Sequence, residues 1–182
     1  DAKDPALKDR AECLKLVMQP GMRPGSDHDT QADHKSYGAT TLEGRHVVES
    51  KDGVTLRLVT GKNKGREVEF PIGDKAVAGM LLARAREAGS DGRLFKVSAD
   101  ELRQYSKVKD GGGFKTKDHR TALGTEVAVR AIAGMRAPST VKERKASVKE
   151  VATRVARVLG NTPSVALKSY IDPSVFIPWS KR

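Results

Sequence analysis

Aromatic residues, cysteine and long apolar runs are all scarce in this chain. Phe, Trp and Tyr make up only 4% of the 182 residues, so each aromatic side chain needs a reason for its position. The single cysteine, Cys13, excludes an internal disulfide framework, which agrees with a reducing compartment. Because Cys13 lies in a helical apolar pattern, we expect a buried, inert thiol. No apolar run reaches the roughly 18 residues of a membrane helix, so we expect no membrane partner.

Positive charge, in contrast, is plentiful. The chain has 34 Lys and Arg residues against 23 Asp and Glu residues, which gives a formal net charge of +11. Such an excess favours a polyanionic partner, with nucleic acid ahead of an anionic membrane surface. Charge alone does not establish specific binding, because many basic proteins bind neither nucleic acid nor membranes specifically.

Three short β-like runs follow one another near the N-terminus. Strands are expected at 46–49, 54–59 and 67–72. Lys51-Asp52-Gly53 and the five residues 61–65 supply the glycine-containing turns that hairpins need. The pattern therefore predicts a small three-stranded antiparallel sheet.

Helical periodicity dominates the rest of the sequence. Ser98 and Glu101 form a capping-box pattern that begins a short helix through Tyr105, and a loop is expected at 107–115. Because the helices outnumber the strands and mostly follow them, we expect an α+β fold that is mainly helical. The other predicted helices span residues 5–18, 74–88, 117–135, 140–159 and 162–170.

The polar segment before Tyr37 is expected to be a loop, and it carries candidate metal ligands. Asp27-His28-Asp29 and Asp33-His34 supply carboxylates and imidazoles, but their spacing matches no tight zinc pattern and no cysteine is nearby. We therefore expect no metal site there. The paired acids Asp100 and Glu101 are better explained by helix capping than by a glycosidase-type dyad.

Two basic segments have features suited to binding an anion. The turn at 61–65 leads into a strand, so it is neither a Walker A loop nor a dinucleotide fingerprint, but a lysine on its tip can reach into a partner's groove. Lys117 and Arg120 lie one turn apart at the start of a predicted helix, where exposed amides favour a phosphate. A solvated hairpin tip and a solvated helix start are the alternatives.

Taken together, five short segments resemble the catalytic domain of the type IB DNA topoisomerases, in particular the compact bacterial and poxvirus-like branch. Each is weak alone, but the five occur in the family's order at fitting intervals, over about residues 6–173. The resemblance implies the DNA breaking-rejoining fold and a single catalytic domain at 1–182, without the family's N-terminal clamp domain. The segments are Met22-Arg23-Pro24-Gly25-Ser26, residues 35–42, residues 61–65, residues 117–121 and the stretch that ends at Tyr170.

The resemblance also implies roles for individual residues. Tyr170 matches the nucleophile that becomes joined to a 3′ phosphate of DNA, and Arg23 and Arg120 match the two catalytic arginines. Lys62 matches the catalytic lysine, and Asn161 stands where other branches of the family have histidine. The residues expected to contact DNA are Lys64, Lys117, His119 and Lys168.

These residue types suit the cleavage of a phosphodiester. Two guanidiniums match the charge that collects on two nonbridging oxygens. A phenol has an ordinary pKa of about 10, so nearby cations should favour its nucleophilic phenolate. Lys62 can donate a proton to the leaving 5′ oxygen. Because the covalent link conserves the energy of the broken bond, the resemblance implies relaxation of supercoiled DNA with no ATP, metal or other cofactor.

Two alternatives stay open from the sequence. Tyrosine recombinases share this chemistry, but they usually have His-x-x-Arg where this chain has Lys117-x-x-Arg120, and histidine where it has Asn161. A basic DNA-binding module that keeps the fold without chemistry is the other alternative, and the complete residue set argues against it. We expect double-stranded DNA as the partner, a monomer, and a cytoplasmic, nucleoid-associated location.

Overall fold

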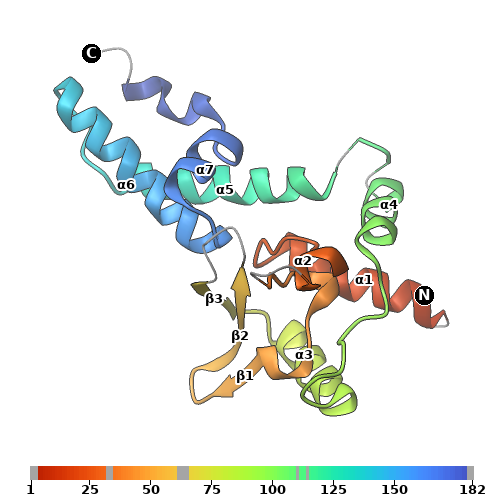
Figure 1. The fold of residues 1–182 in the computed structure, drawn as a ribbon. Coiled ribbons are helices and arrows are strands. Elements are labelled where there is room, and N and C mark those ends of the chain that lie inside the picture. Colours follow the sequence, from red (N-terminus) through yellow and green to blue (C-terminus); the bar gives the residue numbers. More distant parts are fainter. Residues whose placement is uncertain (1–3, 32–34, 61–65, 110, 114, 180–182) are drawn as a thin grey trace.

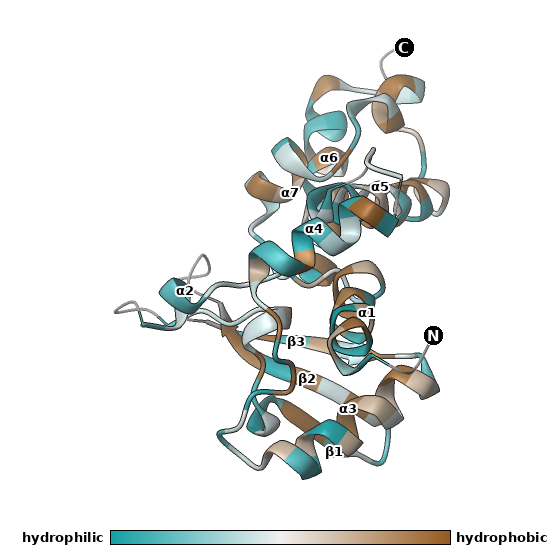
Figure 2. Cartoon of the chain, turned by 90° about the vertical axis from the view of Figure 1, so that its right-hand side faces the viewer, coloured by the Kyte–Doolittle hydropathy of each residue, from teal (hydrophilic) through white to brown (hydrophobic). Residues whose placement is uncertain are grey.

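The computed structural model describes residues 4–31, 35–60, 66–109, 111–113 and 115–179, and it confirms the expected α+β architecture. In Figure 1, helices α5, α6 and α7 gather at the upper left, whereas α1, α3 and the sheet lie below them. Figure 2 shows the same division from the side. We call residues 4–109 the N-terminal region and residues 115–179 the C-terminal region.

Side-chain caps begin several of the helices. Asp4, Asp74, Thr140 and Thr162 each accept backbone N–H groups of the following turn, which stabilises the helix start. The four helices that follow these caps are α1 (Pro5–Met18), α3 (Lys75–Ala88), α6 (Val141–Leu159) and α7 (Pro163–Ser169). The others are α2 (Asp27–Gln31), α4 (Ala99–Lys109) and α5 (Thr116–Ala133).

The three predicted strands form one antiparallel sheet in the order β1-β2-β3. Their bounds are Val47–Ser50 for β1, Gly53–Thr60 for β2 and Arg66–Ile72 for β3. Leu56 and Leu58 on β2 are buried, whereas Arg57 between them points outward and pairs with two glutamates of β3. This alternation is what a sheet with one covered face requires.

Each region has its own apolar core. The N-terminal core joins α1, the sheet, α3 and α4, and the C-terminal core joins α5, α6, α7 and a 3₁₀ helix over Pro173–Trp179. Cys13 is fully buried in the first core, and this burial raises the pKa of its thiol, which confirms the expected environment. Val151, Val155 and Leu159 are buried on the inner face of α6 in the second core.

Two glycines allow the regions to meet closely. Gly21 has φ +72°, and a Cβ there would lie 2.7 Å from the methyl groups of Leu123 and Leu159. Gly160 has φ +61°, and a Cβ there would lie 2.9 Å from Val68 on β3. Only glycine combines this backbone conformation with such close packing.

Three sequence-based expectations need correction. The polar segment before Tyr37 was expected to be a loop, but it contains the short helix α2, which buries none of its residues and is drawn in hydrophilic teal in Figure 2. The loop expected from residue 107 begins later, because α4 continues to Lys109. Gly111 is the first glycine after α4 that has a positive φ. The 3₁₀ helix over Pro173–Trp179 was not predicted. Among the described residues, no helix combines the length and apolar character needed to cross a membrane.

Candidate active site

Arg23 lies on the loop that leaves α1, and main-chain hydrogen bonds hold this loop. The Met22 N–H donates to the carbonyl of Leu16 at 3.0 Å, and the Ala39 N–H donates to the carbonyl of Arg23 at 2.8 Å. The loop packs so tightly that a Cβ on Gly38 would lie 2.7 Å from the same Arg23 carbonyl. The backbone of Arg23 is therefore held by contacts that do not involve its guanidinium.

Arg120 comes from the second turn of α5 and is held by its side chain instead. It is only 2% exposed. One terminal nitrogen donates to the carbonyl of Gly21, and the other donates to the carbonyl of Leu159 at 3.1 Å. Arg120 therefore joins three places: the end of α1, the end of α6 and the start of α5.

Asn161 follows the left-handed glycine that ends α6. The N–H groups of Gly160 and Asn161 both donate to the carbonyl of Ala156, which closes the helix and turns the chain. The Asn161 side chain is 9% exposed, and its carbonyl oxygen accepts a hydrogen bond from the guanidinium of Arg23. This bond links two residues that are 138 positions apart in the sequence.

Tyr170 lies at the last turn of α7, beside Arg120. Its N–H donates to the carbonyl of Ala166 at 3.0 Å, and its backbone then leaves the helical conformation. The guanidinium carbon of Arg120 lies 4.8 Å from the centre of the half-buried phenol ring. A guanidinium at this distance over a ring makes a cation–π contact.

The two arginines are close enough to influence each other. Both line a small cavity of about 10 Å³, together with Tyr37 and Gly160. Burial lowers the pKa of the Arg120 guanidinium from its ordinary value, Tyr170 opposes this shift, and the charge of Arg23 adds to it.

Two buried donors at this site stay unpaired among the described residues. They are the Nε of Arg120 and the side-chain amide nitrogen of Asn161. Buried polar groups in native proteins almost always have a hydrogen-bond partner, so two unpaired donors at one place are unusual. Two such donors beside a second guanidinium make a position suited to an anion.

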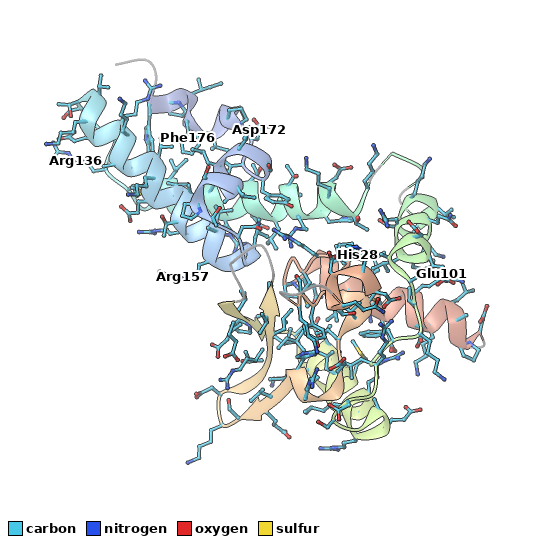
Figure 3. All side chains as sticks on the ribbon, in the orientation of Figure 1. His28, Glu101, Arg136, Arg157, Asp172 and Phe176 are labelled. Carbon is cyan, nitrogen blue, oxygen red and sulfur yellow. The ribbon has the colours of Figure 1, made fainter. Side chains whose placement is uncertain are left out.

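A groove of about 770 Å³ gives access to Asn161 from the side of the sheet. Its walls include Val68 and Phe70 of β3 and Arg157 near the end of α6. Figure 3 places Arg157 at the end of α6 that faces the strands. The groove therefore opens between the two regions, next to the site.

The structure brings together Arg23, Arg120, Asn161 and Tyr170 among the expected site residues, but not all of the others. Lys62 and Lys64 lie outside the described residues. Lys117 and Lys168 are exposed on α5 and α7, and His119 is half-buried with its ring 3.4 Å from the hydroxyl of Ser106. The roles of these lysines and of His119 in DNA binding stay predictions.

The candidate ligands of the polar segment have other partners. Asp27 pairs with Arg93, and Asp29 accepts a hydrogen bond from Ser26. His28 lies exposed on α2 (Figure 3), and Asp33 and His34 lie outside the described residues. In the part of the chain that the structure describes, no group of three or more His, Cys, Asp or Glu residues could hold a metal ion.

The acidic pair at the start of α4 is explained by capping. The carboxylate of Glu101 accepts the N–H and the hydroxyl of Ser98 at 2.9 and 2.8 Å, and it pairs with Arg10. These bonds, led by the backbone one, lower the pKa of Glu101 to about 2. Asp100 pairs with Arg103 on the same helix. The pair therefore stabilises the helix, as the sequence predicts.

The sequence analysis did not identify the groups that hold the site residues in place. The carbonyls of Gly21 and Leu159 hold Arg120, and Gly124 and Thr125 of α5 touch the segment around Tyr170. Backbone carbonyls have no sequence signature. The only available signal is a glycine at a helix end or inside a helix, and that signal is not specific.

A comparison with protein families shows the family of the chain. The family described as eukaryotic DNA topoisomerase I, catalytic core, matches residues 1–174. The chain belongs to this topoisomerase I family. The match confirms the resemblance that the five sequence segments indicate, and it supports a role in DNA relaxation. No curated protein shows a significant match to the chain.

Membership in the topoisomerase I family makes DNA the substrate. It also accounts for the excess of positive charge, because a protein that tracks the DNA backbone needs Lys and Arg to neutralise phosphates. The four residues gathered at the junction of the two regions are therefore the natural candidates for the reaction centre of this topoisomerase I core.

Proposed function

We propose that this chain relaxes supercoiled DNA by cutting one strand through a 3′-phosphotyrosyl intermediate and resealing it without ATP. The observation that carries the proposal is the convergence of Arg23, Arg120, Asn161 and Tyr170 around two buried, unpaired donors. A scissile phosphate between these groups would accept hydrogen bonds from donors that have no other partner among the described residues.

The proposed reaction is a reversible exchange of phosphodiester bonds. The phenolic oxygen of Tyr170 loses its proton to solvent and attacks the phosphorus, which forms the tyrosyl–phosphate bond. The bond between phosphorus and the 5′ oxygen breaks, and that oxygen takes a proton from Lys62. Resealing runs the same steps backward. Charge on the nonbridging oxygens is stabilised by the two guanidiniums and by the amide of Asn161.

The role of Lys62 is supported by its place in the chain. The register of β2 and β3 pairs Thr60 with Arg66, so residues 61–65 join the two strands. The same hairpin contacts Gly160, next to Asn161, through Val68 and Phe70. We propose that Lys62, which lies between these two strands in the sequence, donates the proton to the leaving oxygen. Lys64 of the same segment is proposed to bind DNA.

The proposed DNA-binding surface of the protein consists of side chains that lie outside the two apolar cores. It includes Lys117 and Lys168, which are exposed, and His119. The basic face of α6, with Arg144, Lys145 and Lys149, is proposed to add phosphate contacts. Because such contacts release counterions, we expect DNA affinity to fall steeply as salt concentration rises.

Further features of the proposal come from the resemblance rather than from the site. They are the compact bacterial and poxvirus-like branch and a single catalytic domain that acts as a monomer. A cytoplasmic, nucleoid-associated place of action belongs with them.

The experiment is a plasmid relaxation assay without ATP and without magnesium, with Tyr170→Phe as the control. We expect the wild-type chain to relax the plasmid and to leave a denaturation-resistant protein–DNA adduct. The Tyr170→Phe chain should bind DNA but form no adduct, because it lacks the attacking oxygen. An adduct that survives this substitution contradicts the assignment of Tyr170. A chain that acts only on paired recombination sites contradicts the relaxation function.

A further inference from the structure

The middle of α5 lies against the backbone of Tyr170. A Cβ built on Gly124 would lie 3.2 Å from the Cβ of Tyr170 and well inside 3.0 Å of its carbonyl oxygen. Real Cβ atoms essentially never approach other heavy atoms within 3.0 Å. Any residue larger than glycine at position 124 must therefore move Tyr170, move α5, or both.

The next residue of α5 holds the chain just after Tyr170. The hydroxyl of Thr125 accepts a hydrogen bond from the N–H of Asp172 at 3.1 Å. The carboxylate of Asp172 in turn accepts the N–H of Ser174 at 2.8 Å. Thr125 thus connects α5 to the turn that begins the 3₁₀ helix.

Helix α7 by itself gives Tyr170 little support. It has seven residues, and short helices depend on tertiary contacts for their stability. Tyr170 stands at its end, with φ −135° and ψ 0°. Helix α7 packs mainly on α6, and Tyr170, at the end of α7, also contacts α5 through Gly124 and Arg120.

Arg120 and Gly124 are four positions apart, so they share one face of α5. Arg120 lies over the phenol ring at 4.8 Å, and Gly124 lies under the backbone of the same residue. One helix face thus contacts both the ring and the main chain of Tyr170.

From these contacts we propose that Gly124 and Thr125 are positioning residues for the nucleophile. They hold the backbone of Tyr170 on α5, so that its phenol and the guanidinium of Arg120 keep a constant relative placement. The inference rests on the proposed function, because it concerns the residue that attacks DNA there. It adds that α5, which does not carry Tyr170, helps to determine where the attacking oxygen lies.

The experiment measures covalent adduct formation at saturating DNA and, separately, the affinity for DNA. Gly124→Ala should slow adduct formation about 100-fold, because misplacing a reacting group by about 1 Å costs this much. DNA affinity should stay within about twofold, because Gly124 provides no charge. A loss in the first-order rate without a loss in binding is not expected from a merely structural defect.

A matched control is available in Gly79→Ala. Gly79 is also a helix-interior glycine, in α3, and a Cβ there meets nothing within 4 Å. Both substitutions raise helix propensity by the same amount, so the control isolates the close contacts of Gly124, which are with Tyr170 and with the side chain of Leu159. We expect Gly79→Ala to form adduct at the wild-type rate.

A second pair of variants keeps the proposal testable if Gly124→Ala does not fold. Thr125→Val keeps the shape of the side chain but removes the acceptor for Asp172, and Thr125→Ser keeps the hydroxyl. We expect adduct formation to slow about tenfold in the valine variant and to be nearly normal in the serine variant.

Three results overturn the inference, and one of them also overturns the proposed function. Wild-type rates in both Gly124→Ala and Thr125→Val show that α5 does not position Tyr170. A parallel loss of stability, DNA affinity and rate in Gly124→Ala shows that Gly124 is only a packing residue. If the wild-type chain forms no adduct, or if Tyr170→Phe still forms one, the proposed function fails and the inference fails with it.

Discussion

Arg23 and Arg120 carry the same side chain to the same site, but the two regions hold them in different ways. Arg23 belongs to the N-terminal region and lies on a loop whose main chain is held by the residues around Ala39. Arg120 belongs to the C-terminal region, where its buried guanidinium donates to carbonyls at the ends of α1 and α6. One arginine is therefore positioned by its backbone, and the other is itself part of the packing between the regions.

This difference has a consequence for function. The two apolar cores do not share buried residues, so each region can pack its own interior. The site, in contrast, needs both regions, because Arg23 reaches Asn161 only across the junction. We therefore expect substitutions at the junction to lower activity more than substitutions of similar size inside either core.

The largest expected effect separates the two arginines. Arg120→Ala leaves two carbonyls without their donor, so we expect the free energy of unfolding to fall by about 2–4 kcal/mol. Arg23→Ala should lower it by less than about 1 kcal/mol, because Arg23 is half-buried and has one side-chain partner. Urea unfolding of the two variants measures the difference.

Both arginine variants should lose about 100- to 1,000-fold in the rate of adduct formation, because each removes a donor that the proposed function assigns to the phosphate. Single-turnover kinetics with a DNA duplex measure this loss. If the two variants are equally destabilised, Arg120 is not a structural link between the regions.

A smaller effect is expected at the glycine that joins α6 to the sheet. Gly160→Ala should lower the free energy of unfolding by about 1–3 kcal/mol, since it adds a clash with Val68 to the strain of a positive φ. Gly111→Ala is the control, because Gly111 has a φ of +69° and a Cβ there meets nothing within 4 Å. Denaturant titration of both variants tests the comparison, and equal losses would mean that the contact with β3 is unimportant.

The smallest effect concerns acid stability of the N-terminal region. Burial, aided by the charge of Arg45, lowers the pKa of His46 to about 4. The unfolded chain takes up this proton below about pH 6.5, whereas the folded chain resists it until about pH 4. The stability contributed by a neutral His46 is therefore complete above pH 6.5 and is lost as pH falls from 6.5 to 4.

The His46→Asn variant tests whether a neutral His46 stabilises the protein less as pH falls. Asparagine has an oxygen that can replace the ring nitrogen of His46, which accepts the N–H of Glu43 at 3.0 Å. Between pH 7 and pH 5.5 we expect the wild-type free energy of unfolding to fall by about 1 kcal/mol more than that of the variant. Parallel pH profiles for the two chains would show that His46 is protonated normally when folded.

The elements that sequence reasoning located correctly have short-range causes. The capping box at Ser98 and the cap at Thr140 began helices where the pattern predicts, and the glycine-containing turn at residues 51–53 separated the first two strands. The misses also have local reasons. Helix α2 was not predicted because its polar side chains form no apolar face. The loop was predicted to begin too early, at residue 107, because three successive glycines, 111–113, follow α4.

The site was less accessible to sequence reasoning. Arg23, Asn161 and Tyr170 were singled out only through resemblance to a family, because no local pattern marks them. Gly124 was missed altogether, since a glycine inside a helix usually signals only weak propensity. Its significance appears once the backbone of Tyr170 is placed beside it.

The amino-acid sequence by itself determined the class of fold, the start of most helices and the basic character that suits DNA. These depend on caps, periodicity and charge, which act over a few residues or need no structure at all. Only the tertiary structure decided that residues up to 138 positions apart meet at one point, and that α5 supports the tyrosine. The packing of two separate cores across a junction determines these distances, and no short stretch of sequence contains that information.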